Sequence, residues 1–327
     1  MNSENKKSDF IYPDNAVIMA PLSGFTDIAF RRSLYREGCE FAFCEMVDVS
    51  SLVYCKEKVH PMLVRGEDEK FLGCQLVGSD LEHTKIALEK LNDYNFDVVD
   101  LNLGCPVPKV AKKCAGAELG RQIDRALEVF SLFGKYSRFP ISAKIRILNR
   151  EDVAPTLELV EGLIRLGSKA ITIHGRVKEA YYSGDVDFAQ IKECVKLADN
   201  RCQIIANGGI MDYEKYCEIR EKTTCQAVMV ARGAMGNPYL FSELKDPQNF
   251  QEPTTEKLLQ DMRLHIEEII ELYGEESGLK ISRKILHDYL KGRGFKSSCR
   301  AMASQVATRQ DFEEFLNYTA ANRVIER

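Results

Sequence analysis

The amino-acid sequence predicts an α/β protein: a TIM (β/α)8 barrel followed by an all-helical C-terminal domain. Two observations favour the barrel. Short apolar runs rich in β-branched residues alternate with segments of helical periodicity. Eight such runs over about 230 residues match the strand count of this fold. A third observation indicates the second domain, because beyond a proline-containing polar segment the periodicity is helical only.

We expect the eight strands at 16–21, 41–47, 72–77, 98–104, 141–147, 170–174, 203–207 and 227–231. Apolar residues at helical spacing in 123–130 and 188–195 predict two of the helices between them. Gly38 and Gly167 follow helical patterns where a left-handed cap is expected. A doubly wound open sheet has the same alternation, but no GxGxxG turn follows the first run, so the barrel is favoured.

The barrel rhythm stops near residue 245, and the segment KDPQNFQEPTT has the composition of a linker. We therefore expect a barrel domain at 1–245 and a helical domain at 252–327. One apolar stripe runs from Leu259 to Tyr273, and a second includes Ile285 and Tyr289. A cluster around Phe312 predicts a last helix.

Composition excludes several classes of protein. The chain has 327 residues, of which 45% are hydrophobic and 29% charged, as in globular proteins. A net charge of −4 offers no general attraction to nucleic acid, so any such binding needs a local basic patch. No apolar run reaches the roughly 18 residues of a membrane helix, and residues 1–9 lack the apolar core of a signal peptide. We expect a cytoplasmic, monomeric protein that does not bind membranes.

The chain contains eleven cysteines and no CxxC pair, which argues against a disulfide framework and against a metal site. Cys39, Cys44, Cys194 and Cys217 lie in apolar stretches, where we expect small buried hydrophobic residues. Cys105 differs, because it stands between Gly104 and Pro106 at a strand end. A thiol there can donate a proton or act as a nucleophile, and the sequence leaves both open.

Polar residues collect at the predicted carboxyl ends of the strands, where barrels carry their function. A Lys, a Gln and a His inside apolar strands need polar partners. The residues concerned lie in or directly after strands one and three to eight: Pro21, Leu22, Ser23, Gln75, Asn102, Cys105, Lys144, His174, Arg176, Asn207, Gly208, Gly209, Ala231 and Arg232. Their convergence on one rim predicts an active site.

Glycine-rich turns follow strands seven and eight. Gly208 and Gly209 permit close backbone approach, and exposed N–H groups there can cradle a phosphate. Arg232 adds a charge that suits a phosphorylated ligand. Alternatively, these two segments are ordinary glycine turns that bind no ligand.

Lys144 suits a flavin, because a cation near the ring stabilises its anionic reduced form. The amides of Gln75 and Asn102 can hydrogen-bond the edge of a heterocycle, which favours the flavin. Lys144 could instead form a Schiff base, as in aldolase barrels, or be a salt-bridged structural residue.

At these residues the chain resembles the tRNA-dihydrouridine synthases, nearly from end to end. The matching stretches are MAPLSGFTD (19–27), QLVGSD (75–80), DLNLGCPVPKV (100–110), AKIR (143–146), HGRVKEAYYSGDVDF (174–188), ANGGI (206–210), ARGAMGNP (231–238) and RKILHDYLKG (283–292). Single pieces recur in other flavin barrels, whereas their order is specific to this family.

The resemblance implies FMN-dependent reduction of tRNA uridines to 5,6-dihydrouridine, with NADPH as reductant. It makes Cys105 the general acid that protonates carbon 5, while hydride passes from the flavin to carbon 6. It places Pro21, Leu22, Ser23, Gln75, Lys144, His174, Asn207, Gly209, Ala231 and Arg232 on FMN-contacting positions, to which we add Gly208. It places Asn102 near the uracil.

A basic stretch in the C-terminal domain could hold the RNA. Seven cations against one acid lie between Lys280 and Arg300. The substrate-binding residues we expect are Asn102, Lys109, Arg176, Arg283, Lys284 and Lys291. Such a run could also be only a solvated face. Three other functions remain open: a dihydroorotate-dehydrogenase-like flavin enzyme, a non-catalytic RNA-binding or chaperone protein, and an aldolase that uses Lys144.

Overall fold

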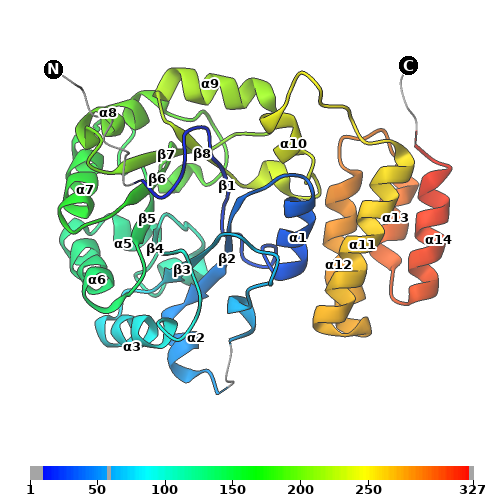
Figure 1. Ribbon diagram of the computed structural model, residues 1–327, viewed down its shortest axis with the longest axis horizontal. Coiled ribbons are helices and arrows are strands. Elements are labelled where there is room, and N and C mark those ends of the chain that lie inside the picture. Colours follow the sequence, from blue (N-terminus) through cyan, green and yellow to red (C-terminus); the bar gives the residue numbers. More distant parts are fainter. Residues whose placement is uncertain (1–9, 57–59, 324–327) are drawn as a thin grey trace. The chain divides into compact units, whose positions relative to one another are not determined.

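The computed structural model describes residues 10–56 and 60–323 (Figure 1). Residues 1–9, whose polarity predicts a cytoplasmic location, lie outside the described residues. The described chain forms two compact units. The first contains residues up to 24, together with 40–210 and 214–231, and the second contains 25–39, 211–213 and residues from 232 on.

The first unit is a closed barrel of eight parallel strands in sequence order. The strands are β1 (Val17–Met19), β2 (Phe41–Asp48), β3 (Leu72–Val77), β4 (Val98–Leu103), β5 (Ile141–Arg146), β6 (Ala170–His174), β7 (Gln203–Asn207) and β8 (Ala227–Val230). Pairing of β8 with β1 closes the barrel and leaves no edge strand. The predicted TIM barrel is confirmed.

Strand β1 is shorter than the predicted strand at 16–21. The Ala20 amide still donates to the Val230 carbonyl at 2.8 Å. Pro21 has no N–H group, so the ladder cannot continue through it.

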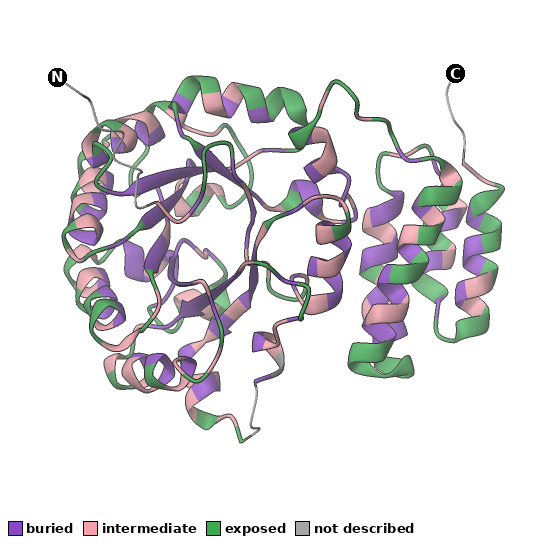
Figure 2. Ribbon diagram, viewed as in Figure 1, coloured by how far each residue is buried: buried purple, intermediate pink, exposed green. Residues whose placement is uncertain are grey.

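Helices and 3-10 turns connect the strands, and their inner faces are buried while their outer faces are exposed (Figure 2). They are α2 (Val49–Tyr54), η1 (Pro61–Leu63), α3 (Leu81–Leu91), α4 (Pro108–Ala111), α5 (Ala117–Gly120), α6 (Ile123–Tyr136), α7 (Ala154–Arg165), η2 (Lys178–Ala180), α8 (Phe188–Ala198) and α9 (Tyr213–Thr223). Gly167 follows α7 with φ 89°, which confirms the predicted left-handed cap.

The expectation of buried cysteines holds for Cys39, Cys44 and Cys194 and is wrong for Cys217. Cys217 is exposed because α9 buries Tyr216 and Ile219, and Cys217 lies on the opposite, outer face of this helix.

The barrel interior changes from apolar to polar along the strands. An apolar cluster that includes Ile18, Val98, Ile205 and Met229 fills the part of the interior that precedes the polar residues along the strands. Because strand residues alternate in direction, the side chains two and four positions after Val98 point to the same interior. These are Asp100 and Asn102, and the barrel therefore carries a polar layer at the carboxyl ends of its strands.

The second unit is helical, which confirms the predicted all-helical C-terminal region. Its elements are α1 (Ile28–Arg36), η3 (Arg232–Ala234), α10 (Leu240–Lys245), α11 (Thr255–Tyr273), α12 (Glu275–Leu290), α13 (Ser297–Gln305) and α14 (Arg309–Ala320). Its core contains Met262, Ile266, Leu286 and Phe315. The predicted linker corresponds to the segment between α10 and α11, and Gly38 caps α1 with φ 88°.

Candidate active site at the carboxyl ends of the strands

A buried hydrogen-bond chain crosses β3, β4 and β5 inside the barrel. The register sets Asp100 beside Gln75 on one side and Ser142 on the other. Asp100 accepts hydrogen bonds from Gln75 Nε2 and Ser142 Oγ, each at 2.7 Å, and Gln75 Oε1 accepts from Asn102 Nδ2 at 2.7 Å. A carboxylate only accepts, so Asp100 fixes which way the Gln75 amide points, and Gln75 fixes Asn102.

Asn102 in turn holds the backbone at Cys105 in place. Its Oδ1 accepts the backbone N–H of Gly104 at 3.1 Å and that of Cys105 at 2.9 Å. The Cys105 carbonyl accepts the Ala117 N–H at 3.0 Å. Gly116 makes this approach possible, because its φ is 63° and a Cβ there would lie 2.6 Å from the Cys105 oxygen. Cys105 is thus held, half-buried, at the strand end.

The burial of Cys105 favours a protonated thiol. Burial raises the pKa of Cys105, and the nearby Arg146 and Lys144 cations oppose this only in part. Burial and Arg146 lower the pKa of Lys144 to about 8. Burial also raises the pKa of Asp100 to about 6. At neutral pH the site therefore holds a thiol, a cationic lysine and a carboxylate.

Lys144 connects the hydrogen-bond layer to the glycine turn after β7. Its Nζ donates to Asn207 Oδ1 at 2.9 Å, and Asn207 Nδ2 donates to the Met229 carbonyl at 2.8 Å. Gly208 and Gly209 follow with φ of 128° and 76°. Within residues 10–56 and 60–323, their two N–H groups have no hydrogen-bond acceptor. This turn therefore presents free donors, as an anion site does.

His174 is the last residue of β6, Arg176 follows this strand, and the two side chains contact one another. Arg176 Nη1 lies 3.2 Å from His174 Nε2, and Arg176 Nε donates to the Gly184 carbonyl at 2.8 Å. The His174 ring stacks on Tyr182 at a centroid distance of 6.5 Å. Both His174 and Arg176 are buried, so the Arg176 guanidinium is engaged by the chain itself.

The remaining predicted cofactor residues lie in the loop after β1 and in the segment after β8. Pro21 and Leu22 are half-buried and Ser23 is exposed, in a loop held by a hydrogen bond from the Gly24 N–H to the Glu45 carboxylate. Ala231 is half-buried and follows β8. Arg232 comes next in the chain, is exposed, and belongs to the second unit.

The lysines after Cys105 differ in whether their charges are paired with an acidic side chain. Lys113 Nζ contacts Asp48 at 2.6 Å, so its charge is paired. Lys109, in α4, and Lys112 are exposed and have no hydrogen-bond or ion-pair partner among the described residues. Lys109 is the predicted substrate-binding residue closest in sequence to the thiol.

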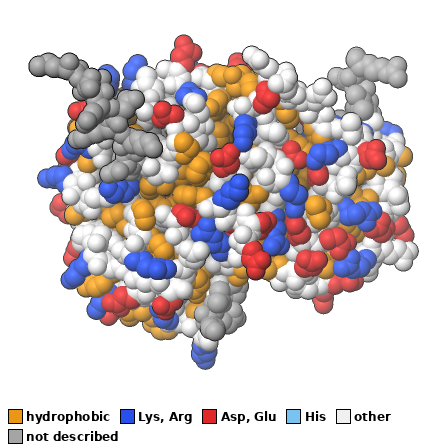
Figure 3. Space-filling model, in the orientation of Figure 1, with side chains coloured by type: hydrophobic (Ala, Val, Ile, Leu, Met, Phe, Trp, Pro, Cys, Tyr) orange, Lys and Arg blue, Asp and Glu red, His pale blue; other side chains and the backbone are white. Residues whose placement is uncertain are grey.

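The predicted basic stretch of the second unit is partly used for internal contacts. Arg283 Nε donates to the Val306 carbonyl at 2.7 Å, and Lys284 Nζ lies 4.3 Å from the centre of the Phe25 ring. Arg293 donates to the Gly236 carbonyl at 2.9 Å. Lys291 is exposed. Figure 3 shows side chains of both signs interspersed on the visible face, so no large single-sign surface is seen there.

Two buried carboxylates of the site, Asp100 and Glu45, are absent from the residues predicted for it. The alternation of Asp100 with Asn102 in VVDLNL could have identified the first, since both must face one side of the strand. Nothing comparable distinguishes Glu45, which is the single acid inside β2 before its final Asp48.

Two absences hold for the part of the chain that the structure describes. No group of three His, Cys, Asp or Glu side chains is arranged to hold a metal ion. No helix combines the length and apolar character needed to cross a membrane.

Comparison with known proteins identifies relatives along most of the chain. A family model described as "Dihydrouridine synthase (Dus)" matches residues 18–325. The tRNA-dihydrouridine synthase B of Pasteurella multocida is 30% identical over 282 residues, 85% of this chain and 84% of that protein. A probable tRNA-dihydrouridine synthase of Rickettsia bellii is 31% identical over 313 residues, 91% of this chain and 94% of that protein. One of Helicobacter pylori is 30% identical over 97% of this chain and 94% of that protein.

Proposed function

Since the chain belongs to the dihydrouridine synthase family, we propose that it reduces uridines of tRNA to 5,6-dihydrouridine, with FMN as cofactor and NADPH as reductant. One arrangement carries this assignment: a protonated thiol, Cys105, held by Asn102 at the carboxyl end of a barrel beside the Lys144 cation. That arrangement supplies a proton donor and a cation at the same rim.

The residues present fit FMN. The glycine turn offers a phosphate two N–H donors that no described residue accepts, and a Cβ at Gly208 would lie only 2.9 Å from His174 Cδ2, so the close approach needs glycine. Lys144 is the cation for the ring, and Gln75 is an amide for its edge. The residues we propose to hold FMN are Pro21, Leu22, Ser23, Gln75, Lys144, His174, Asn207, Gly208, Gly209, Ala231 and Arg232. Bound FMN, once reduced by NADPH, supplies the hydride that reaches carbon 6 of uracil.

Cys105 completes the reduction with a proton. Hydride addition at carbon 6 places negative charge on the carbonyl oxygen and carbon 5, and the Cys105 Sγ–H gives its proton to carbon 5. The thiolate that remains regains a proton from water. The raised pKa of Cys105 supports this role over nucleophilic attack, which would want a depressed thiol pKa.

The substrate is a base inside a folded RNA, so the enzyme must hold more than the uracil. We propose that Asn102 contacts the uracil and that Lys109, Lys284 and Lys291 contact RNA. Arg176 and Arg283 are engaged by backbone carbonyls, so we propose that they act by ordering the segments that meet the RNA. Residues 252–327 would form the RNA-binding domain of a cytoplasmic monomer.

Purified protein tests this function directly. We expect a yellow preparation that absorbs near 450 nm, is bleached by NADPH, and converts uridine to dihydrouridine in unmodified tRNA but leaves free orotate unchanged. A colourless protein that binds RNA would indicate the non-catalytic alternative. Turnover of orotate would indicate a dihydroorotate-dehydrogenase-like enzyme, and borohydride trapping of a carbonyl substrate on Lys144 would indicate an aldolase.

A further inference from the structure

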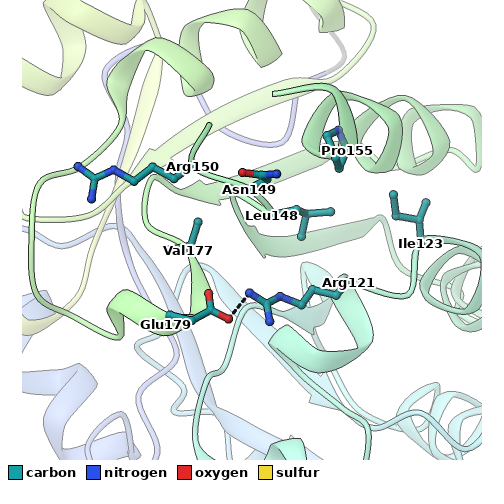
Figure 4. Close-up of a pocket in the computed structure, with 8 residues that line it drawn as sticks. All are labelled: Arg121, Ile123, Leu148, Asn149, Arg150, Pro155, Val177 and Glu179. Atoms are coloured by element: carbon teal, nitrogen blue, oxygen red, sulfur yellow. Dashed lines mark hydrogen bonds and ion pairs between the residues drawn. The ribbon is translucent and has the colours of Figure 1, made fainter. Parts of the chain in front are cut away.

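A cavity of about 510 Å³ lies in the loops that follow β4, β5 and β6 (Figure 4). Its apolar lining includes Ile123, Leu148 and Val177, and its charged lining is Arg121, Arg150 and Glu179. The volume lies in the range of roughly 300–1,000 Å³ that small-ligand sites occupy. An apolar surface with cations beside it suits a ligand that combines a heterocycle with a phosphate.

The loop that carries Arg150 is held in place by its backbone. The Leu148 N–H donates to Thr156 Oγ1 at 3.0 Å. Gln190 Nε2 donates to the Asn149 carbonyl at 2.8 Å and to the Arg150 carbonyl at 3.1 Å. The cavity is therefore formed before any ligand arrives, which lowers the entropy cost of binding.

The two arginines of the cavity differ in their partners. Arg121 pairs with Glu179, and Figure 4 shows these two side chains facing each other. The exposed Arg150 guanidinium has no hydrogen-bond or ion-pair partner among residues 10–56 and 60–323. Two guanidinium groups and one carboxylate leave the lining with one net positive charge.

The cavity is tied to the candidate active site through Arg146. Arg146 Nε donates to the Gly104 carbonyl, next to Cys105, at 2.7 Å. Its Nη1 donates to the Val177 carbonyl, in the cavity wall, at 3.2 Å. One buried side chain thus connects the loop of the thiol with the wall of the cavity.

We propose that this cavity binds one nucleotide of the RNA strand next to the reacting uridine, with its phosphate on Arg150 and its base or ribose against Leu148 and Val177. This subsite rests on the proposed function, because only a polynucleotide substrate places a second nucleotide beside the first. Arginine suits the contact, since its planar fork matches phosphate oxygens.

Charge favours this occupant over the nicotinamide dinucleotide. A phosphodiester carries one negative charge, which matches the single net positive charge of the lining. NADPH carries a pyrophosphate and a further 2′-phosphate, and the cavity has no cations to spare for them.

The test uses the FMN-loaded enzyme and unmodified tRNA. Arg150→Ala should weaken tRNA binding about 3- to 10-fold at low salt and lower the salt-dependence slope by roughly one. Arg150→Lys keeps the charge but lacks the planar fork, so it should restore only part of this loss. Glu179→Gln should act in the opposite direction and tighten binding about 2- to 5-fold, because it frees Arg121 and removes a negative charge.

Arg165→Ala is the matched control. Arg165 is an exposed arginine in the last turn of α7, about 15 Å along that helix from Pro155 at the cavity. It should leave tRNA binding unchanged. Rapid mixing of each variant with NADPH, without RNA, should give the wild-type rate of flavin reduction, and thermal unfolding checks that each variant is folded.

Two results would overturn the subsite alone. If Arg150→Ala binds tRNA like Arg165→Ala, the cavity does not hold a nucleotide of the RNA. If it slows flavin reduction by NADPH and leaves tRNA binding intact, the occupant is the dinucleotide. By contrast, a wild-type enzyme that neither binds tRNA nor modifies it contradicts the proposed function itself, and the subsite with it.

Discussion

Cys105 is the residue that we propose as the proton donor, and burial raises the pKa of its thiol. Cys105→Ala removes the proton donor and leaves the residues proposed for FMN in place. We expect flavin reduction by NADPH to stay within about twofold of wild type, while oxidation of the reduced enzyme by tRNA slows by roughly 10²–10⁴-fold. Stopped-flow absorbance separates the two half-reactions. Equal slowing of both would show that Cys105 maintains the site and does not donate the proton.

Lys144 gives the site a pH dependence of known sign. Its pKa is lowered to about 8, so its positive charge is lost as pH rises through that value. We propose that this cation stabilises anionic reduced flavin, so the midpoint potential of bound FMN should fall more steeply above pH 8 in wild type than in Lys144→Gln. Potentiometric titration between pH 6 and 10 measures this. Identical slopes in the two proteins would remove Lys144 from the flavin's surroundings.

Asp100 should couple folding stability to pH. Burial raises its pKa from 3.8 to about 6, so the folded protein binds this proton more tightly than the unfolded chain does. The free energy of unfolding then falls as pH rises from about 4 to about 6, by on the order of 3 kcal/mol for this group. Asp100→Asn lacks this dependence and still accepts from Gln75. Urea unfolding of both proteins across this range should diverge, and parallel profiles would contradict the assigned burial.

At the scale of elements, the turn after β7 requires glycine for two reasons. Gly208 has φ 128°, and a Cβ would meet His174 Cδ2 at 2.9 Å. Gly208→Ala should destabilise the protein by about 1–3 kcal/mol and weaken FMN binding. Gly167→Ala is the control, because its φ of 89° is also positive but a Cβ there meets nothing within 4 Å.

Gly167→Ala introduces backbone strain alone, whereas Gly208→Ala adds a steric contact with His174. Thermal unfolding measures the stability of the two variants, and titration measures their FMN affinity. Gly167→Ala should cost less stability and leave FMN affinity unchanged. Equal FMN affinity in Gly208→Ala and wild type would place the phosphate elsewhere.

The strands could be predicted from sequence more completely than the helices. Seven of the eight parallel strands lie within one residue of the expected bounds, because strands buried on both faces are continuous apolar runs between polar loops. The sequence pattern does not predict helix α13 individually, since this helix buries only Cys299 and Ala303 and has a weak apolar pattern. The grouping of α1 with the C-terminal helices depends on tertiary contacts that no local pattern reports.

Candidate site residues can be predicted where a polar residue interrupts an apolar strand, as with Gln75, Lys144 and His174. Asp100 is not among the predicted site residues, because the motif around Cys105 does not include this inward-facing residue two positions before Asn102. Partners that come from another strand, such as Asn207 for Lys144, follow only once the barrel register is known. Likewise, the exposure of Cys217 depends on which face of its helix is buried, and composition alone does not report this.

In the whole molecule, we propose that the barrel carries the chemistry and that the C-terminal helices hold the RNA. The net charge of −4 means that this grip must come from local cations, such as Lys109, Lys284 and Lys291. Binding should therefore weaken steeply with salt despite the acidic chain, whereas reduction of the flavin by NADPH should depend on salt much less.

The most direct measurement is a map of dihydrouridine in RNA from cells with and without this gene. We expect at least one tRNA position to lose the modification on deletion, and to regain it with the wild-type gene but not with Cys105→Ala. Unchanged tRNA after deletion, or full restoration by the Cys105→Ala gene, would contradict the central claim that this barrel reduces uridine with a proton from Cys105.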